Sequence, residues 1–105
     1  MNELIDKIED VVLDILKAGI YSSENKLKLL VELMIETFPE VMAVYYNPLM
    51  AGHAQDAAYW PEQLERIIGT INSGDELAVM DVLYNETRPN LIELKGILEG
   101  KGIAL

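Results

Sequence analysis

The sequence contains no cysteine, so it forms neither a disulfide framework nor a thiolate metal site, and it offers no cysteine nucleophile. Positive charge is also scarce, because eight Lys and Arg residues stand against eighteen Asp and Glu residues, for a net charge of −10. A chain this acidic cannot neutralise a run of phosphates, which excludes a general nucleic-acid binder, and an anionic membrane surface would repel it.

Long apolar runs are missing as well. No uncharged stretch approaches the ~20 apolar residues of a membrane span, and acidic residues interrupt the start of the chain where a secretory signal would need an unbroken apolar run. We therefore expect a cytoplasmic protein that does not act at a membrane.

Motifs for catalysis and for cofactors are absent too. The sequence has no nucleophile elbow, phosphate-binding loop, dinucleotide fingerprint or EF-hand loop. His53 is the single histidine, and with Asp56 it makes one H-x-x-D pair, whereas a di-iron bundle needs two E-x-x-H motifs. We expect no cofactor, no metal site and no catalytic residue, and the sequence favours a protein that is not an enzyme.

Apolar residues at helical spacing dominate the first half of the chain. The 105 residues, half of them apolar, are typical of one domain over residues 1–105, and the spacing of its apolar residues predicts that it is helical. An apolar stripe predicts a helix over residues 3–18 that ends at Gly19. A second helix is expected to begin at a cap formed by Ser22 or Ser23 and to end at Pro39. The stretch 37–40 resembles a capping box for a short third helix through Tyr46.

The second half is expected to form two more helices. Residues 47–55 are predicted to be a loop, followed by a helix from Asp56 to Asn72 with Pro61 in its first turn or at a kink. Residues 73–76 fit the S-x-x-E capping box of a last helix, in which Pro89 predicts a kink. Apolar residues in that helix follow a heptad seam: Leu77, Met80, Tyr84, Thr87, Leu91, Leu94 and Leu98. Since no segment alternates with period two, we predict an all-α fold, an antiparallel bundle of four to five helices.

The last third of the chain also carries a pattern of Gly-Asp, Asp, Glu and Pro at fixed spacing. The residues are Ser73-Gly74-Asp75-Glu76-Leu77-Ala78, Asp81-Val82-Leu83, Glu86 and Pro89-Asn90-Leu91. This pattern resembles small helical proteins of Firmicutes that are grouped as domains of unknown function. The resemblance implies a helical fold and a bacterial cytoplasmic setting, and it implies no activity.

Polar residues cluster just before Pro89. Asp81, Asn85 and Arg88 share one helix face, and Glu86 lies on another. We interpret Asp81, Asn85, Glu86 and Arg88 as a polar network that holds the kinked helix in register. The alternative is a polar site at the kink, where the carbonyl of Asn85 could receive a ligand or partner donor.

The segment 41–60 is uncharged except for Asp56 and holds four of the seven aromatic residues, Tyr45, Tyr46, Tyr59 and Trp60, together with His53. Three interpretations remain open. These residues close the core, or they form a contact surface for a protein partner or a homodimer, or they line a small-molecule pocket under residues 47–60. The leading hypothesis is a non-enzymatic protein-interaction module or homo-oligomer, and the alternative is a small-molecule binding protein or enzyme.

Overall fold

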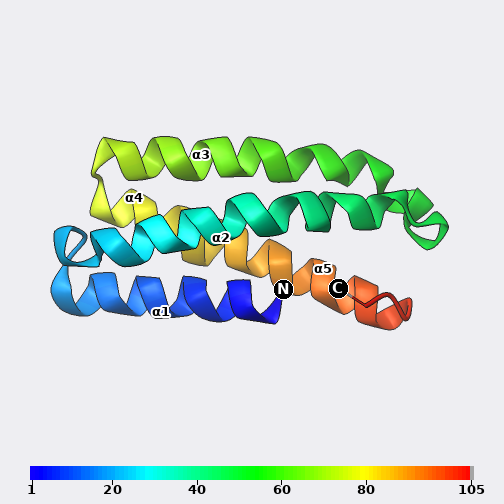
Figure 1. The fold of residues 1–105 in the computed structure, drawn as a ribbon, viewed down its shortest axis with the longest axis horizontal. Coiled ribbons are helices and arrows are strands. Elements are labelled where there is room, and N and C mark those ends of the chain that lie inside the picture. The colour runs from blue at the N-terminus through cyan, green and yellow to red at the C-terminus, as the bar shows by residue number, and fades with distance from the viewer. Residues whose placement is uncertain (105) are drawn as a thin grey trace.

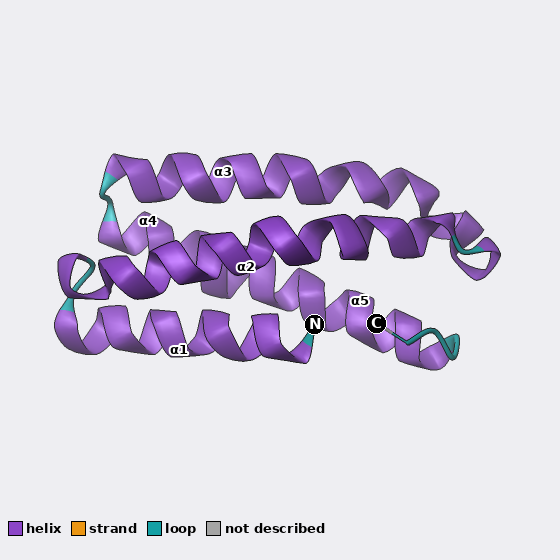
Figure 2. Cartoon of the chain, in the orientation of Figure 1, coloured by secondary structure: helices purple, strands orange, loops and turns teal. Residues whose placement is uncertain are grey.

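The computed structural model describes residues 1–104, which form helices and no strand (Figures 1 and 2). The all-α prediction is confirmed; the predicted domain range, 1–105, reaches one residue beyond the described part. The α-helices are α1 (Asn2–Ala18), α2 (Glu24–Ala43), α3 (Tyr59–Ser73), α4 (Glu76–Met80) and α5 (Arg88–Gly100). The 3-10 helices are η1 (Tyr21–Ser23), η2 (Val44–Tyr46) and η3 (Pro48–Ala58), and a π-helical segment, η4 (Asp81–Thr87), joins α4 to α5.

The helices lie side by side in an elongated molecule of 43 × 21 × 20 Å. The chain reverses direction after α1, after α2 and after α3, and the continuous run α4–η4–α5 returns along the molecule (Figure 1). α2 packs against α1 and α3, while η4 also packs against α1 and α3. One cluster of buried apolar residues runs through this assembly, so all the main helices share a core.

Helix α1 follows its prediction closely. Its stripe, which includes Leu4, Ile8, Val11 and Ile15, is buried. The helix ends at Gly19, whose φ of 86° suits a residue without a side chain.

Pro39 does not end α2, which continues to Ala43, so the capping box at residues 37–40 and the separate third helix were wrong predictions. Phe38 and Val41 are both buried in the core on either side of the proline, and helical geometry is what places both there. The carbonyl that the proline ring leaves without a donor belongs to Ile35, an exposed residue, where water can reach it.

Neither serine caps α2 with its side chain, so the predicted serine cap is also wrong. Ser23 stands at the N-cap position but is buried, and its hydroxyl is within bonding distance of the Asp14 carboxylate, at 2.7 Å, and the Gly19 carbonyl, at 3.0 Å. A charged acceptor makes the stronger hydrogen bond, so the hydroxyl joins α2 to α1 instead.

The predicted loop at 47–55 is helical. Asn47 accepts a hydrogen bond from the Leu49 amide at 3.0 Å and starts the 3-10 segment η3, which buries Met50. The following helix begins at Tyr59, not at Asp56. Pro61 lies in its first turn, one of the two predicted alternatives, where a missing N–H removes no helical bond.

The connection from α3 to α4 differs from the S-x-x-E prediction. Gly74 ends α3 in the left-handed conformation, and Asp75 is the residue that caps α4, accepting from the Ala78 amide at 3.1 Å. Ser73 remains part of α3 and donates to the Thr70 carbonyl at 2.6 Å. An aspartate directly before the first helical residue takes the capping role ahead of a serine two residues earlier.

Candidate functional site: a groove between α1 and α4

The π segment η4 divides the predicted heptad seam into two halves that face different ways. Thr87, Leu91, Leu94 and Leu98 are buried as predicted. Leu77 and Tyr84 are exposed, and their place in the core is taken by Val79, Val82 and Leu83. A π turn contains one residue more than an α turn, so it rotates the helix before it relative to the helix after it. The seam prediction is therefore wrong for Leu77 and Tyr84, whereas Met80 is partly buried and packs against the core.

Pro89 explains where this π turn occurs. A proline in a regular helix collides with the carbonyl four residues earlier, here that of Asn85. The wider turn accommodates the proline, and the amide of Arg88 bonds to the carbonyl of Leu83, five residues back. The irregularity predicted at Pro89 thus lies in the turn before it.

Two buried hydrogen bonds, which we call the relay, hold the π segment against α3. The Thr87 hydroxyl donates to the Val82 carbonyl at 2.8 Å and accepts from Gln63 Nε2 at 3.0 Å. Both side chains are buried. Sequence reasoning missed this relay, although a signal was present, because Gln63 stands at a helical position between the buried Trp60 and Ile67 of α3.

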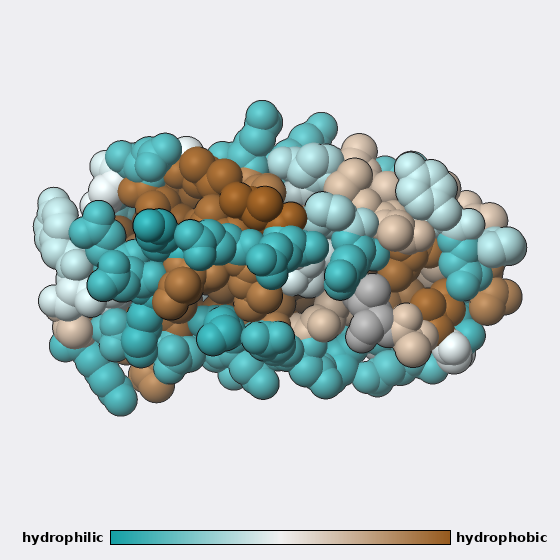
Figure 3. Space-filling model, viewed as in Figure 1, coloured by the Kyte–Doolittle hydropathy of each residue, from teal (hydrophilic) through white to brown (hydrophobic). Residues whose placement is uncertain are grey.

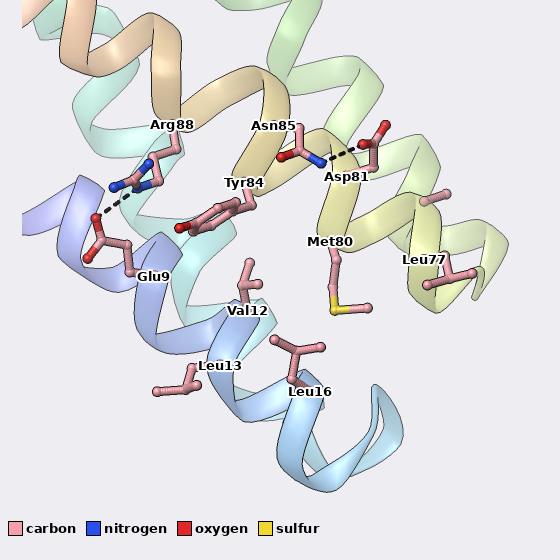
Figure 4. A pocket seen from close by; sticks show the side chains of 11 residues that line it. Glu9, Val12, Leu13, Leu16, Leu77, Met80, Asp81, Tyr84, Asn85 and Arg88 are labelled. Atoms are coloured by element: carbon pink, nitrogen blue, oxygen red, sulfur yellow. Dashed lines mark hydrogen bonds and ion pairs between the residues drawn. The ribbon is translucent and has the colours of Figure 1, made fainter.

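The rotation places the first half of the seam in a groove of about 890 Å³ between α1 and the α4–η4 run (Figure 4). One wall carries Leu13 and Leu16 of α1, and the other carries Leu77, Met80 and Tyr84. Among the described residues ten large hydrophobic side chains are exposed, and four of them line this one groove. Leu16 and Leu77 are the most exposed of the four, at 66% and 75%. Apolar side chains gathered in this way mark an interaction surface, whereas the same residues scattered singly would not.

Polar side chains fix one end of the groove. Arg88 Nε donates to Glu9 Oε1 at 2.8 Å, and its guanidinium lies 4.7 Å from the centre of the Tyr84 ring (Figure 4). The Glu9 carboxylate holds the pKa of Arg88 above its usual value. The ion pair and the cation–π contact together join α1 to the helix that follows η4 and hold the tyrosine ring in the groove wall.

The predicted polar network forms only in part. Asn85 Nδ2 donates to Asp81 Oδ1 at 2.8 Å, as the spacing suggested. Arg88 bonds to Glu9 of α1, and Glu86 accepts from Arg66 of α3 at 2.8 Å. Asp81 and Asn85 therefore bond within their own helical run, whereas Glu86 and Arg88 join that run to α3 and α1.

Two of the aromatic residues in segment 41–60 take the core alternative. Trp60 is 2% exposed, and its Nε1 donates to the buried Tyr45 hydroxyl at 2.9 Å. The indole packs edge-to-face on Phe38 and Tyr59, with ring centres 5.4 and 4.9 Å apart. Burial raises the pKa of Tyr45 and of Tyr59. Of the four aromatic residues only Tyr46 is largely exposed to solvent, at 88%, so the four do not form one contact surface.

A small pocket does lie under this segment. It is bounded by Tyr45, His53, Tyr59 and Trp60, with Asn90 donating to the Tyr59 hydroxyl at 2.6 Å, and Tyr46 is not part of it. Its volume of about 270 Å³ falls below the roughly 300–1,000 Å³ of small-molecule sites. His53 Nδ1 lies 3.6 Å from Asp56 Oδ2, and within residues 1–104 no third His, Asp or Glu joins the pair to hold a metal.

A second surface hollow, of about 1,000 Å³, lies between α2 and α3. Figure 3 shows hydrophobic surface there beside a hydrophilic band that follows α2. Tyr21 is the one large exposed hydrophobic residue in its lining, and Glu24, Lys28 and Glu32 stand among its other members. The α1–α4 groove therefore contains more of the exposed large hydrophobic side chains, four against one.

Sequence reasoning missed the groove because it treated Leu77, Met80 and Tyr84 as core. Leu13 and Leu16 offered a signal, since they extend the apolar stripe of α1 beyond the width that one buried face needs. In the part of the chain that the structure describes, no helix combines the length and apolarity needed to cross a membrane. No protein-family model, curated protein or solved structure matches this chain, so the resemblance to Firmicutes proteins stays a prediction.

Proposed function

We propose that this chain is a non-enzymatic protein-interaction module and that it binds its partner in the groove between α1 and α4. The observation that carries this proposal is the gathering of Leu13, Leu16, Leu77 and Tyr84, all exposed, around one hollow. The partner surface differs from the one that the sequence suggested, because the aromatic residues Tyr45 and Trp60 are buried elsewhere.

The exposed leucines supply the driving force. Covering an apolar side chain contributes about 25 cal/mol per Å² removed from water, or roughly 1.5–3 kcal/mol for a leucine that passes from fully exposed to fully buried. Leu16 and Leu77 are about two-thirds and three-quarters exposed, so each retains most of that gain for a partner. A few central side chains carry most of the affinity of a protein interface, and tyrosine, here Tyr84, is among the types most often found in that role.

We also infer that the helices form an antiparallel bundle of four segments, with α4, η4 and α5 as one of them, in a cytoplasmic protein. The chain reversals in Figure 1 and the contacts between neighbouring helices support this arrangement. A bundle held by a shared core gives the groove two walls of fixed separation, which lowers the ordering cost of binding.

The test is affinity capture with the chain as bait, using Leu16→Glu and the matched control Leu29→Glu. Leu29 is similarly exposed, at 59%, and lies outside the groove lining. Both variants add one charge at a solvent-exposed leucine, so both are expected to keep the far-UV circular dichroism of the parent. We expect Leu16→Glu to lose the captured partner and Leu29→Glu to keep it. Equal capture by both variants would refute the groove as the docking surface.

A further inference from the structure

We propose, on the basis of this docking function, that the occupant of the groove is an amphipathic α-helix of a partner protein with basic residues flanking its apolar face. The proposal rests on the geometry of the two walls and on the charge around them.

The walls have the spacing of a helix-binding surface. Leu77, Met80 and Tyr84 follow one another at steps of three and four residues, and Leu13 and Leu16 face them at a step of three. These steps are those of a heptad seam whose partner helix is missing, because η4 has turned that part of the seam out of the core. At about 1.5 Å per residue the exposed seam rises ~10 Å, which matches the apolar face of about two turns of a helix.

The charge around the groove selects a basic partner. Arg88 is paired with Glu9, whereas Asp81 accepts its hydrogen bond from the neutral amide of Asn85 and takes part in none of the ion pairs within residues 1–104. Asp6 is exposed one helical turn before Glu9 on α1 and adds a further acid near that end. The net charge of −10 attracts a cationic helix and repels a second copy of this chain.

The test uses two designed, fluorescently labelled peptides of about 18 residues, or five helical turns. Both carry leucines at heptad spacing, one with lysines and the other with glutamates on the remaining positions. Fluorescence anisotropy with the full chain is expected to show binding of the lysine peptide and none of the glutamate peptide. Leu16→Glu is expected to weaken binding of the lysine peptide about tenfold or more, because an interface anchor is lost, while Leu29→Glu changes it little. Asp81→Asn is expected to weaken it a few-fold and to reduce its dependence on salt.

Several outcomes would overturn the proposal. Binding of the lysine peptide that Leu16→Glu and Leu29→Glu reduce equally would show attraction to the acidic surface alone. Equal binding of both peptides would remove the basic requirement. Self-association of the chain that Leu16→Glu abolishes would identify a second copy as the occupant. Failure of both peptides to bind, with captured partner still lost in Leu16→Glu, would reject a basic helix while leaving the docking function in place.

Discussion

The buried relay between α3 and the π segment gives the sharpest test of the structure. Thr87→Val keeps the shape of the side chain and removes only its hydroxyl. Gln63 Nε2, on a residue that is 5% exposed, then loses its acceptor, and the Val82 carbonyl loses its side-chain donor. An unsatisfied buried donor costs about 1–3 kcal/mol and the second lost hydrogen bond about 0.5–1.5 kcal/mol, so we expect the free energy of unfolding to fall by roughly 2–3 kcal/mol.

A substitution of the partner residue, Gln63→Leu, and the double variant separate the effect of the hydrogen bonds from that of packing. In Gln63→Leu the Thr87 hydroxyl still donates to Val82, so a loss of about 1 kcal/mol is expected. The double variant leaves no amide without a partner. It is therefore expected to be about 1–2 kcal/mol more stable than the sum of the two single losses predicts.

The assay is urea denaturation monitored by circular dichroism. The slope of the free energy of unfolding against urea concentration should be the same for all four proteins. A domain of this size is typically stable by about 5–15 kcal/mol, so differences of this order are measurable. If the two single losses add in the double variant to within about 0.5 kcal/mol, Gln63 and Thr87 do not act as one buried unit and the relay is refuted.

Three further predictions concern ionisation and fluorescence. Burial raises the pKa of Tyr45 and Tyr59 above 10.0, so the stability that their neutral hydroxyls contribute is complete below pH 10 and is lost as the pH rises. Denaturation at alkaline pH should show a fall in the free energy of unfolding. A Tyr45→Phe variant should show a smaller fall. The Ser23 hydroxyl lowers the pKa of Asp14 below 3.8, so stability present above that pH is lost as the pH falls further, and a Ser23→Ala variant whose acid denaturation curve is unchanged would contradict this. Trp60 is buried in the isolated chain, so its emission should already be blue-shifted and insensitive to protein concentration; emission accessible to a soluble quencher would argue against that burial.

The sequence predicted α1 well because its apolar stripe is complete and Gly19 ends it locally. The same reasoning failed at Pro39, where the local tendency of proline to stop a helix is overridden by packing. Phe38 and Val41 both enter the core only if the helix continues, and that requirement comes from residues distant in the sequence.

The groove was harder to predict because a regular helix and a helix with a π turn can carry the same heptad pattern of apolar residues. The heptad from Leu77 to Leu98 is what a regular buried helix would show, and a π turn leaves no signature in spacing alone. Segment 41–60 is ambiguous in the same way, since an uncharged aromatic stretch is compatible with both a buried core and an interface. The bond from Trp60 to Tyr45 and the packing on Phe38 decide between them, and both follow from tertiary contacts.

The π segment also means that this helix contains one residue more than its core contacts need. Deleting a residue from a regular helix turns everything beyond it by about 100° and destroys its packing. Deleting Asn85 together with Pro89→Ala, which removes the ring that opposes an α turn, would instead convert the π turn into an α turn, with Val79 and Leu83 still aligned with Leu91. In the Pro89→Ala background, loss of Asn85 should therefore leave the helical circular dichroism signal, whereas loss of Glu93 from α5 should abolish cooperative unfolding. Pro89 is therefore the residue that ties the chain length between residues 81 and 87 to the π turn.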